Sequence, residues 1–216
     1  GDVGTSIYAV DGTQWRALDE WQAAIAPDWA GYAHSDIAAL FAGTAQLTPQ
    51  EPARQNRFKV SYFTPLDTDQ GALLEAMERR LSSLGIRSSL IWSVDEAKGT
   101  GLLDILPERA TKLHAVRFLM ERTGFDDAHA LFGGDSGNDL PVLTSGMQCV
   151  LVRNAAREVR EQAAAELRRR GLEDRLYLAQ GGFLGMNGHY AAGVLEGLTP
   201  FLPATAGWMQ AARAAR

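Results

Sequence analysis

The sequence has only one cysteine, no excess of basic charge and no long apolar run. Each of these features excludes certain classes of protein. The single Cys149 excludes an internal disulfide framework and a cysteine-based zinc site. With 21 Lys and Arg against 26 Asp and Glu, the formal net charge is −5, which argues against non-specific nucleic-acid binding. No stretch approaches the ~20 apolar residues of a membrane helix, and no secretory signal is visible. We expect a cytoplasmic protein, a monomer or weak homo-oligomer, with no nucleic-acid or membrane partner.

Strand and helix patterns alternate in the second half of the 216 residues. The run Leu-Leu-Asp-Ile-Leu at 102–106 predicts a buried strand, and further strands are expected at 129–132, 148–152 and 175–178. Helices are expected between and after them, at 110–122, 138–143, 157–169 and 189–198. Such an alternation predicts an α/β fold with a mostly parallel sheet and helices on both faces.

Residues 12–101 have a different character and predict a separate α+β module. Amphipathic spacing indicates helices at 15–25, 35–41 and 70–84, and β-prone runs indicate strands at 58–63 and 87–94. The predicted partition is therefore a core of residues 1–11 and 102–216, with residues 12–101 inserted as a cap.

The segment 133–139, Gly-Gly-Asp-Ser-Gly-Asn-Asp, is the strongest chemical signal. Its two carboxylates, Asp135 and Asp139, follow a buried strand, which is where open α/β sheets bind ligands. Hard oxygen donors at that edge suit Mg²⁺, which binds through one or two carboxylates. The alternative is a simple turn in which Asp135 or Asn138 caps the next helix.

Lys112 lies in the first turn of the helix expected at 110–122. A lysine there opposes the helix dipole, so a nearby anion such as a phosphate would justify it. The alternative for a lysine taken alone is a solvated side chain.

Lys112 followed by Gly-Asp-Ser-Gly-Asn-Asp resembles motifs three and four of the haloacid dehalogenase superfamily of phosphatases. The runs at 3–8, 55–62 and 103–107 are similar to sucrose-phosphate phosphatases. The resemblance covers nearly the whole chain and implies a Rossmann-like core with an inserted α/β cap.

The resemblance also implies a mechanism and residue roles. An N-terminal Asp attacks phosphorus to form an aspartyl-phosphate, a second Asp two residues later acts as general acid, and Mg²⁺ and a lysine neutralise the phosphoryl oxygens. Asp135 would then bind Mg²⁺, and Asp139 would support the metal or orient Lys112. Lys112 would stabilise the phosphoryl charge, and Asn138 would position groups at the phosphate.

The nucleophile motif of this family would precede Val3, so we expect the N-terminal part of the core to be absent from this sequence. The Asp-Thr-Asp at 67–69 has a similar spacing, but it follows Pro65 and is interpreted as a turn and helix cap. The 216-residue chain is accordingly expected to hydrolyse no phosphate ester alone.

The cap is expected to select the substrate. Aromatic and hydroxyl groups suit a neutral sugar. The alternative is that the aromatic side chains pack the cap and that Ser61 is solvated. The resemblance favours Gln55, Asn56 and Lys59 as sugar contacts, with Ser61 on the same strand face as Lys59. Sucrose 6-phosphate is the leading substrate, followed by mannosylfructose phosphate or another glycosyl phosphate.

Two other functions and the role of one loop stay open. The chain could be a phosphatase-like domain that binds a sugar phosphate or a partner without turnover. A serine hydrolase built on Ser136 and His189 is a distant third, because no nucleophile elbow surrounds Ser136. The glycine-rich segment 181–189 predicts a mobile loop, in which His189 has either a capping or surface role or a place facing the substrate.

Overall fold

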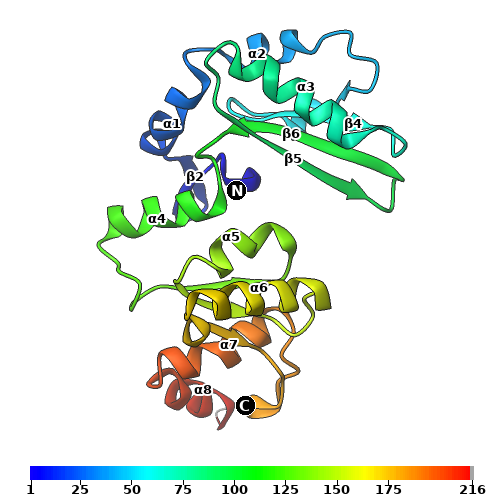
Figure 1. The fold of residues 1–216 in the computed structure, drawn as a ribbon. Helices are drawn as coiled ribbons and strands as arrows, with labels where there is room; N and C mark the ends of the chain where they lie inside the picture. Colours follow the sequence, from blue (N-terminus) through cyan, green and yellow to red (C-terminus); the bar gives the residue numbers. More distant parts are fainter. Residues whose placement is uncertain (215–216) are drawn as a thin grey trace. The chain divides into compact units, whose positions relative to one another are not determined.

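The computed structural model describes residues 1–214, which form the fold drawn in Figure 1. The chain divides into two compact units, Gly1–Ala115 and Val116–Arg216. No helix within residues 1–214 has the length and apolar character needed to cross a membrane. The two units are described in turn.

An antiparallel sheet of four strands organises the first unit (Figure 1). Its order is β3-β4-β6-β5, with β4 and β6 at the centre. The strands are β3 (Thr48–Pro49), β4 (Val60–Thr64), β5 (Ser88–Asp95) and β6 (Thr100–Pro107). In the register of β4 and β6, Val60 pairs with Ile105 and Ser61 with Asp104. Since neighbouring residues of a strand face opposite sides, one face is apolar and the other carries polar groups.

Helices pack on the apolar face of this sheet. They are α2 (His34–Leu40) and α3 (Gln70–Ser82), whereas α1 (Asp19–Ile25) packs against the short helix Ala26–Trp29 that follows it. Ile37, Met77 and Leu81 of these helices are buried with Val60 and Ile105 of the sheet. The Asp69 carboxylate accepts a hydrogen bond from Ala72 N at 3.0 Å and caps α3, which confirms the helix-cap interpretation of residues 67–69.

A β-hairpin near the N-terminus differs from the sequence expectation. The helix predicted at 15–25 is wrong in its first part, because the chain forms β1 (Tyr8–Asp11) and β2 (Gln14–Ala17) before α1 begins. Gly12 adopts φ +57° and closes the two-residue turn between the strands. Tyr8 and Trp15 pack edge to face across the hairpin.

A parallel sheet of three strands, in the order β7-β8-β9, organises the second unit. The strands are β7 (Leu131–Gly134), β8 (Gln148–Leu151) and β9 (Leu176–Leu178). The unit's helices are most of α4 (Lys112–Thr123), then α5 (Leu140–Leu143), α6 (Arg157–Arg170), α7 (Tyr190–Phe201) and α8 (Thr205–Ala214). His189 takes the N-cap position of α7.

Helices cover both faces of this parallel sheet. The Cys149 thiol lies 3.5 Å from Val142 O of α5, whereas the neighbouring Val150 side chain faces Gly197 of α7. A Cβ at Gly197 would approach Val150 Cγ2 to 2.3 Å, so glycine permits the close packing of α7 on β8. The α/β class with a parallel sheet is therefore confirmed.

Residues 102–106 lie in a different sheet from the one predicted from the sequence. They were expected in the parallel sheet, but β6 pairs antiparallel with β4 and β5. The expectation failed because a continuous apolar run marks any strand buried on both faces, including a central antiparallel one. The parallel strands all lie after residue 130. The predicted partition into residues 1–11 with 102–216 and residues 12–101 remains a prediction.

A buried carboxylate ties three segments of the first unit together. Asp28 is fully buried, and its Oδ1 accepts hydrogen bonds from Arg87 Nη2 at 2.5 Å and from Arg109 Nε at 3.0 Å. Its Oδ2 accepts from Arg109 N at 2.8 Å. These contacts join the turn after α1 to the start of β5 and to the segment that leads from β6 into α4.

We predict that Asp28→Ala lowers the free energy of unfolding by about 2–3 kcal/mol, because hydrogen bonds to a charged group are lost and the part-buried N–H of Arg109 is left unpaired. Urea unfolding followed by circular dichroism measures the change. The matched control is Asp67→Ala at an exposed position, which should leave the midpoint unchanged. Equal midpoints for both variants would contradict the prediction.

Candidate active site

The loop after β7 is organised by the carboxylate of Asp139. Asp139 is 4% exposed, and its Oδ2 accepts hydrogen bonds from Asp135 N at 3.1 Å and Ser136 N at 3.2 Å. Ser136 Oγ lies 3.1 Å from the same oxygen. The carboxylate therefore satisfies backbone donors that the tight turn would otherwise leave unpaired. Ser136 is the N-cap of the short helix Gly137–Asp139, so the cap predicted for Asp135 or Asn138 is not formed by either.

Gly134 makes this turn possible. A Cβ at this position would lie 2.9 Å from Asp139 Cβ and 3.0 Å from Asp139 Oδ2. A larger residue would push the carboxylate away from the loop that it holds. Lack of space for a Cβ therefore explains the glycine at position 134 of the motif.

Asp135 is the exposed carboxylate of the loop. Within residues 1–214, no group donates a hydrogen bond to its side chain, and it lies at the carboxyl end of a parallel strand. This donor suits a hard cation such as Mg²⁺, which keeps water and substrate oxygens as its other ligands. No cluster of three or more His, Cys, Asp or Glu with metal-ligating geometry occurs in the described part of the chain. The exposed Asn138, whose Oδ1 lies 2.9 Å from Ser136 Oγ, stands beside Asp135 in the same loop.

Lys112 belongs to the first unit and is the first residue of α4. Thr111 Oγ1 accepts a hydrogen bond from His114 N at 3.2 Å and so caps this helix. Gly4, at φ +113°, presses against the same segment, since a Cβ there would approach Thr111 C to 2.7 Å. The Thr111 cap and the close approach of Gly4 therefore fix where the helix begins at Lys112.

Three polar side chains meet on the polar face of β4 and β6. Lys59 Nζ lies 3.4 Å from Asp104 Oδ1, and Ser61 Oγ donates a 2.5 Å hydrogen bond to the same oxygen. The Lys59 and Asp104 side chains are 12% and 17% exposed, whereas Ser61 is fully buried. Lys59 and Asp104 can thus offer a donor and an acceptor to a ligand, and Ser61 holds Asp104 in place. We call Lys59, Ser61 and Asp104 the cap polar cluster.

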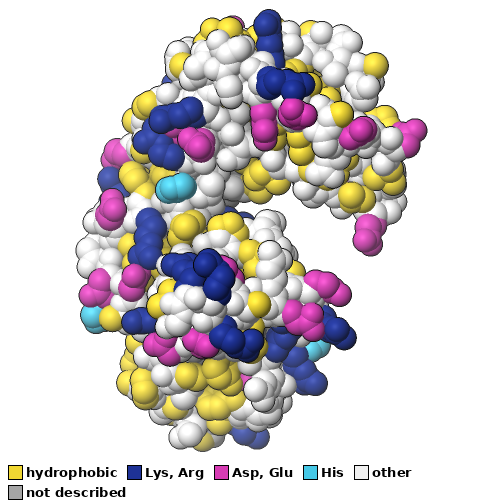
Figure 2. All heavy atoms as spheres, viewed as in Figure 1, with side chains coloured by type: hydrophobic (Ala, Val, Ile, Leu, Met, Phe, Trp, Pro, Cys, Tyr) yellow, Lys and Arg dark blue, Asp and Glu magenta, His cyan; other side chains and the backbone are white. Residues whose placement is uncertain are grey.

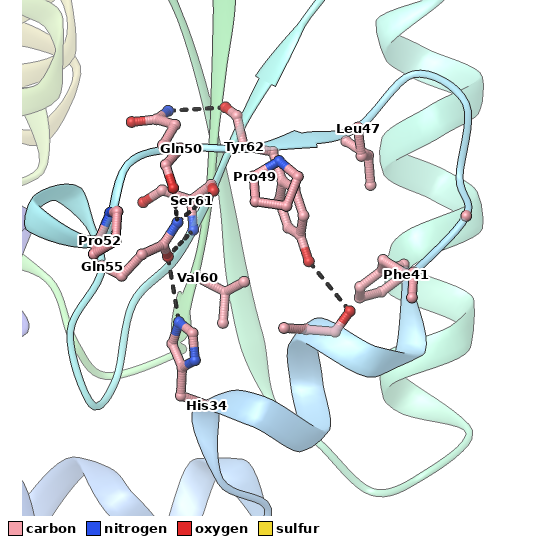
Figure 3. A pocket seen from close by; sticks show the side chains of 13 residues that line it. His34, Phe41, Leu47, Pro49, Gln50, Pro52, Gln55, Val60, Ser61 and Tyr62 are labelled. Atoms are coloured by element: carbon pink, nitrogen blue, oxygen red, sulfur yellow. Dashed lines mark hydrogen bonds between the residues drawn. The ribbon is translucent and has the colours of Figure 1, made fainter.

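Gln55 supports this cluster from the edge of the sheet (Figure 3). Its Oε1 accepts from Ser61 N at 2.8 Å, and its Nε2 donates to Ser61 O at 2.8 Å and to Gln50 O at 3.1 Å. The side-chain amide therefore pairs with β4 as a neighbouring strand would. Its role in the structure is to hold the backbone of Ser61.

Asn56 points elsewhere. Its Nδ2 donates to Thr5 Oγ1 at 2.8 Å, and its Oδ1 accepts from Phe58 N at 2.9 Å. Of the expected sugar contacts, the structure brings Gln55, Lys59 and Ser61 together and turns the Asn56 amide toward the N-terminal segment. Sequence reasoning missed Asp104 as a site residue. The signal was the single acid within the apolar run at 102–106, but only the register with Ser61 shows its partners.

Acidic and basic side chains are interspersed over the surface drawn in Figure 2. Neither sign of charge is gathered into a single block on this face.

A parallel sheet whose first loop carries Gly-Asp-Ser-Gly-Asn-Asp, in a chain that also forms an antiparallel α/β module, places this protein in the haloacid dehalogenase superfamily. Within that superfamily, the chain belongs to the family of sucrose-6F-phosphate phosphohydrolase, whose sequence model matches residues 1–202.

Individual relatives agree with this assignment. The chain is 53% identical over 215 residues to a HAD-like hydrolase of Nitrosococcus oceani; the match covers 99% of this chain and 57% of that protein. The chain thus spans little more than half the length of this curated relative. The crystal structure of a Synechocystis sucrose-phosphatase, in complex with sucrose and phosphate, superposes with a TM-score of 0.66 at 26% identity, over 92% of this chain and 71% of that one. A haloacid dehalogenase-like hydrolase of Bacillus subtilis shares the fold, with a TM-score of 0.54 at 18% identity over 92% of this chain and 66% of its own.

The two acids of the loop should differ in what they contribute to stability. We predict that Asp139→Ala lowers the free energy of unfolding by about 2–3 kcal/mol, because it removes the acceptor of several loop donors. Asp135→Ala, at an exposed position of the same loop, should leave the unfolding midpoint unchanged. Chemical unfolding of the two variants without added metal makes the comparison. A loss of the same size in both would show that Asp139 does not hold the loop.

Proposed function

We propose that the protein carrying this chain is a Mg²⁺-dependent phosphatase that hydrolyses a sugar phosphate, with sucrose 6-phosphate as the leading substrate. The observation that carries the proposal is the loop after β7, in which a buried Asp139 holds an exposed Asp135 at the ligand-binding edge of a parallel sheet. The family of the chain and the sucrose and phosphate bound by the Synechocystis relative support it.

The loop supplies the phosphoryl part of the proposed site. Asp135 would hold Mg²⁺, with Asn138 beside it and Asp139 fixing the backbone between them. The bound metal would polarise a phosphoryl oxygen and stabilise the charge of the transition state. Lys112 would add a positive charge for the same oxygens. The aspartyl-phosphate route needs the carboxylate of motif one, so the roles proposed for these residues are binding and charge stabilisation.

The cap polar cluster supplies the proposed sugar part. Lys59 donates and Asp104 accepts hydrogen bonds, which suits hydroxyl groups that do both. The ion pair of the two side chains leaves little net charge at the cluster, so a second phosphate would gain little there. Gln55 and Ser61 would act indirectly, by holding Asp104 and the strand that carries it.

Substitution of the exposed acid tests the phosphatase proposal. In the complete protein that carries this chain, Asp135→Asn should reduce Mg²⁺-dependent hydrolysis of sucrose 6-phosphate at least ~10²-fold, the scale of losing one main electrostatic group. Phosphate release with varied Mg²⁺ measures the effect. Asp174→Asn, at an exposed acid of the same unit, is the control and should retain activity.

Two outcomes would count against the proposal. Full activity of Asp135→Asn would remove this residue from the site. A complete wild-type protein that binds the sugar phosphate but releases no phosphate would favour the alternative, a phosphatase-like binding domain.

The cap polar cluster should affect selectivity more than hydrolysis. We predict that Lys59→Ala in the complete protein lowers kcat/KM for sucrose 6-phosphate about 10-fold, the effect of losing one hydrogen bond to a charged donor. Hydrolysis of p-nitrophenyl phosphate, which has no sugar hydroxyls, should change less than 2-fold by the same reasoning. Lys98→Ala, in the turn between β5 and β6, is the matched cap control. Equal losses on both substrates would show that Lys59 acts on the phosphate or on folding.

A further inference from the structure

A cavity of about 600 Å³ lies in the first unit between α2, the chain from Phe41 to Gln50, and β4 (Figure 3). Its volume falls in the range of small-molecule sites, roughly 300–1,000 Å³. The residues that line it include Ala38 and Phe41 from α2 and the turn after it, Leu47 and Pro49 from the connecting chain, and Val60 and Tyr62 from β4.

The cavity opens on the face of β4 that carries Val60 and Tyr62, and Ser61 also contributes to its lining. The side chains of Val60 and Tyr62 enter the cavity, as Figure 3 shows. Ser61, between them, directs its hydroxyl to Asp104 on the other face. A sugar bound at Lys59 and Asp104 would therefore not occupy this space.

The lining disfavours ligands that carry an ionic charge. It contains no Lys, Arg, Asp or Glu, and its walls are mainly apolar. Burial raises the pKa of Tyr62 to about 12, so this hydroxyl stays neutral at physiological pH. An ionised phosphate would find no counter-charge here, and burying it would be costly. The charge of the lining matches a neutral, largely apolar molecule.

The His34 ring offers a hydrogen-bonding atom at the rim of the cavity. Gln55 Nε2 donates to two backbone carbonyls, which fixes the orientation of its amide and makes Oε1 an acceptor. His34 Nε2, 3.3 Å from that oxygen, is then the donor of the pair. When the ring is neutral, its Nδ1 is therefore an acceptor, and residues 1–214 provide no donor to it. It can accept a hydrogen bond from a ligand.

We propose that this cap cavity is a ligand site of its own, which binds a small, neutral, largely apolar molecule carrying one N–H or O–H donor for His34. The site is independent of the proposed phosphatase activity. Its affinity can be measured on the chain without substrate or metal.

Fluorescence titration with N-phenyl-1-naphthylamine tests the proposal, because this probe is neutral, aromatic and carries a single N–H. Saturable binding of one probe per chain is expected. Ala42→Trp at the exposed rim and Ala38→Trp in the wall should each raise Kd at least ~10-fold, since the added indole occupies volume that the ligand needs. Ala39→Trp, at an exposed position of the same helix outside the lining, is the matched control and should keep the wild-type Kd.

The hydrogen bond from the ligand's donor to His34 is tested separately. His34→Phe should raise Kd about 5-fold for N-phenyl-1-naphthylamine, the scale of one neutral hydrogen bond, and should leave Kd unchanged for its N-methyl derivative, which has no donor.

Three results would overturn the proposal. They are no saturable binding to the folded chain, an unchanged Kd in Ala42→Trp, and a dimer in sedimentation equilibrium that Ala42→Trp dissociates. The last result would assign the cavity to a second copy of the chain.

Discussion

The register between β4 and β6 is the constraint on which the first unit depends. Pairing Ser61 with Asp104 brings the acid under the Ser61 hydroxyl and beside the Lys59 amine. The same register places Val60 opposite Ile105 on the other face, where the helices pack. A slip of one residue would exchange the two faces and turn the acid into the apolar core. One backbone register thus sets both the core and the polar cluster.

In the second unit, the main constraint is that two carboxylates lie in one short loop. Asp139 is nearly buried, and the backbone N–H groups of Asp135 and Ser136 offset its charge and its desolvation. Asp135 remains exposed, so its charge is directed outward at the sheet edge. The two acids of the motif therefore have different places in the loop: Asp139 holds its backbone, and Asp135 faces outward from it.

The sequence predicts local features of this structure well and long-range pairing poorly. The alternation of residues 58–63 correctly puts Lys59 and Ser61 on one face, and the glycine-flanked motif at 133–139 forms the expected turn at the carboxyl end of a strand. The strand at 102–106 was assigned to the wrong sheet, because an apolar run does not reveal its partners. Asp104 was missed for the same reason. The two roles within the loop at 135–139 also depend on backbone hydrogen bonds that residue types do not encode.

Gln55 shows how the two faces of the antiparallel sheet are connected. Its amide makes two hydrogen bonds with the backbone of Ser61, whose hydroxyl is a donor to Asp104 on the polar face. On the other side, the same amide oxygen faces His34 at the rim of the cavity. Moving Gln55 would break both bonds to Ser61 and leave a buried strand N–H unpaired, which is costly. A change to the cavity at this rim would therefore also disturb Gln55, which holds Ser61 and, through Ser61, Asp104 of the cap polar cluster.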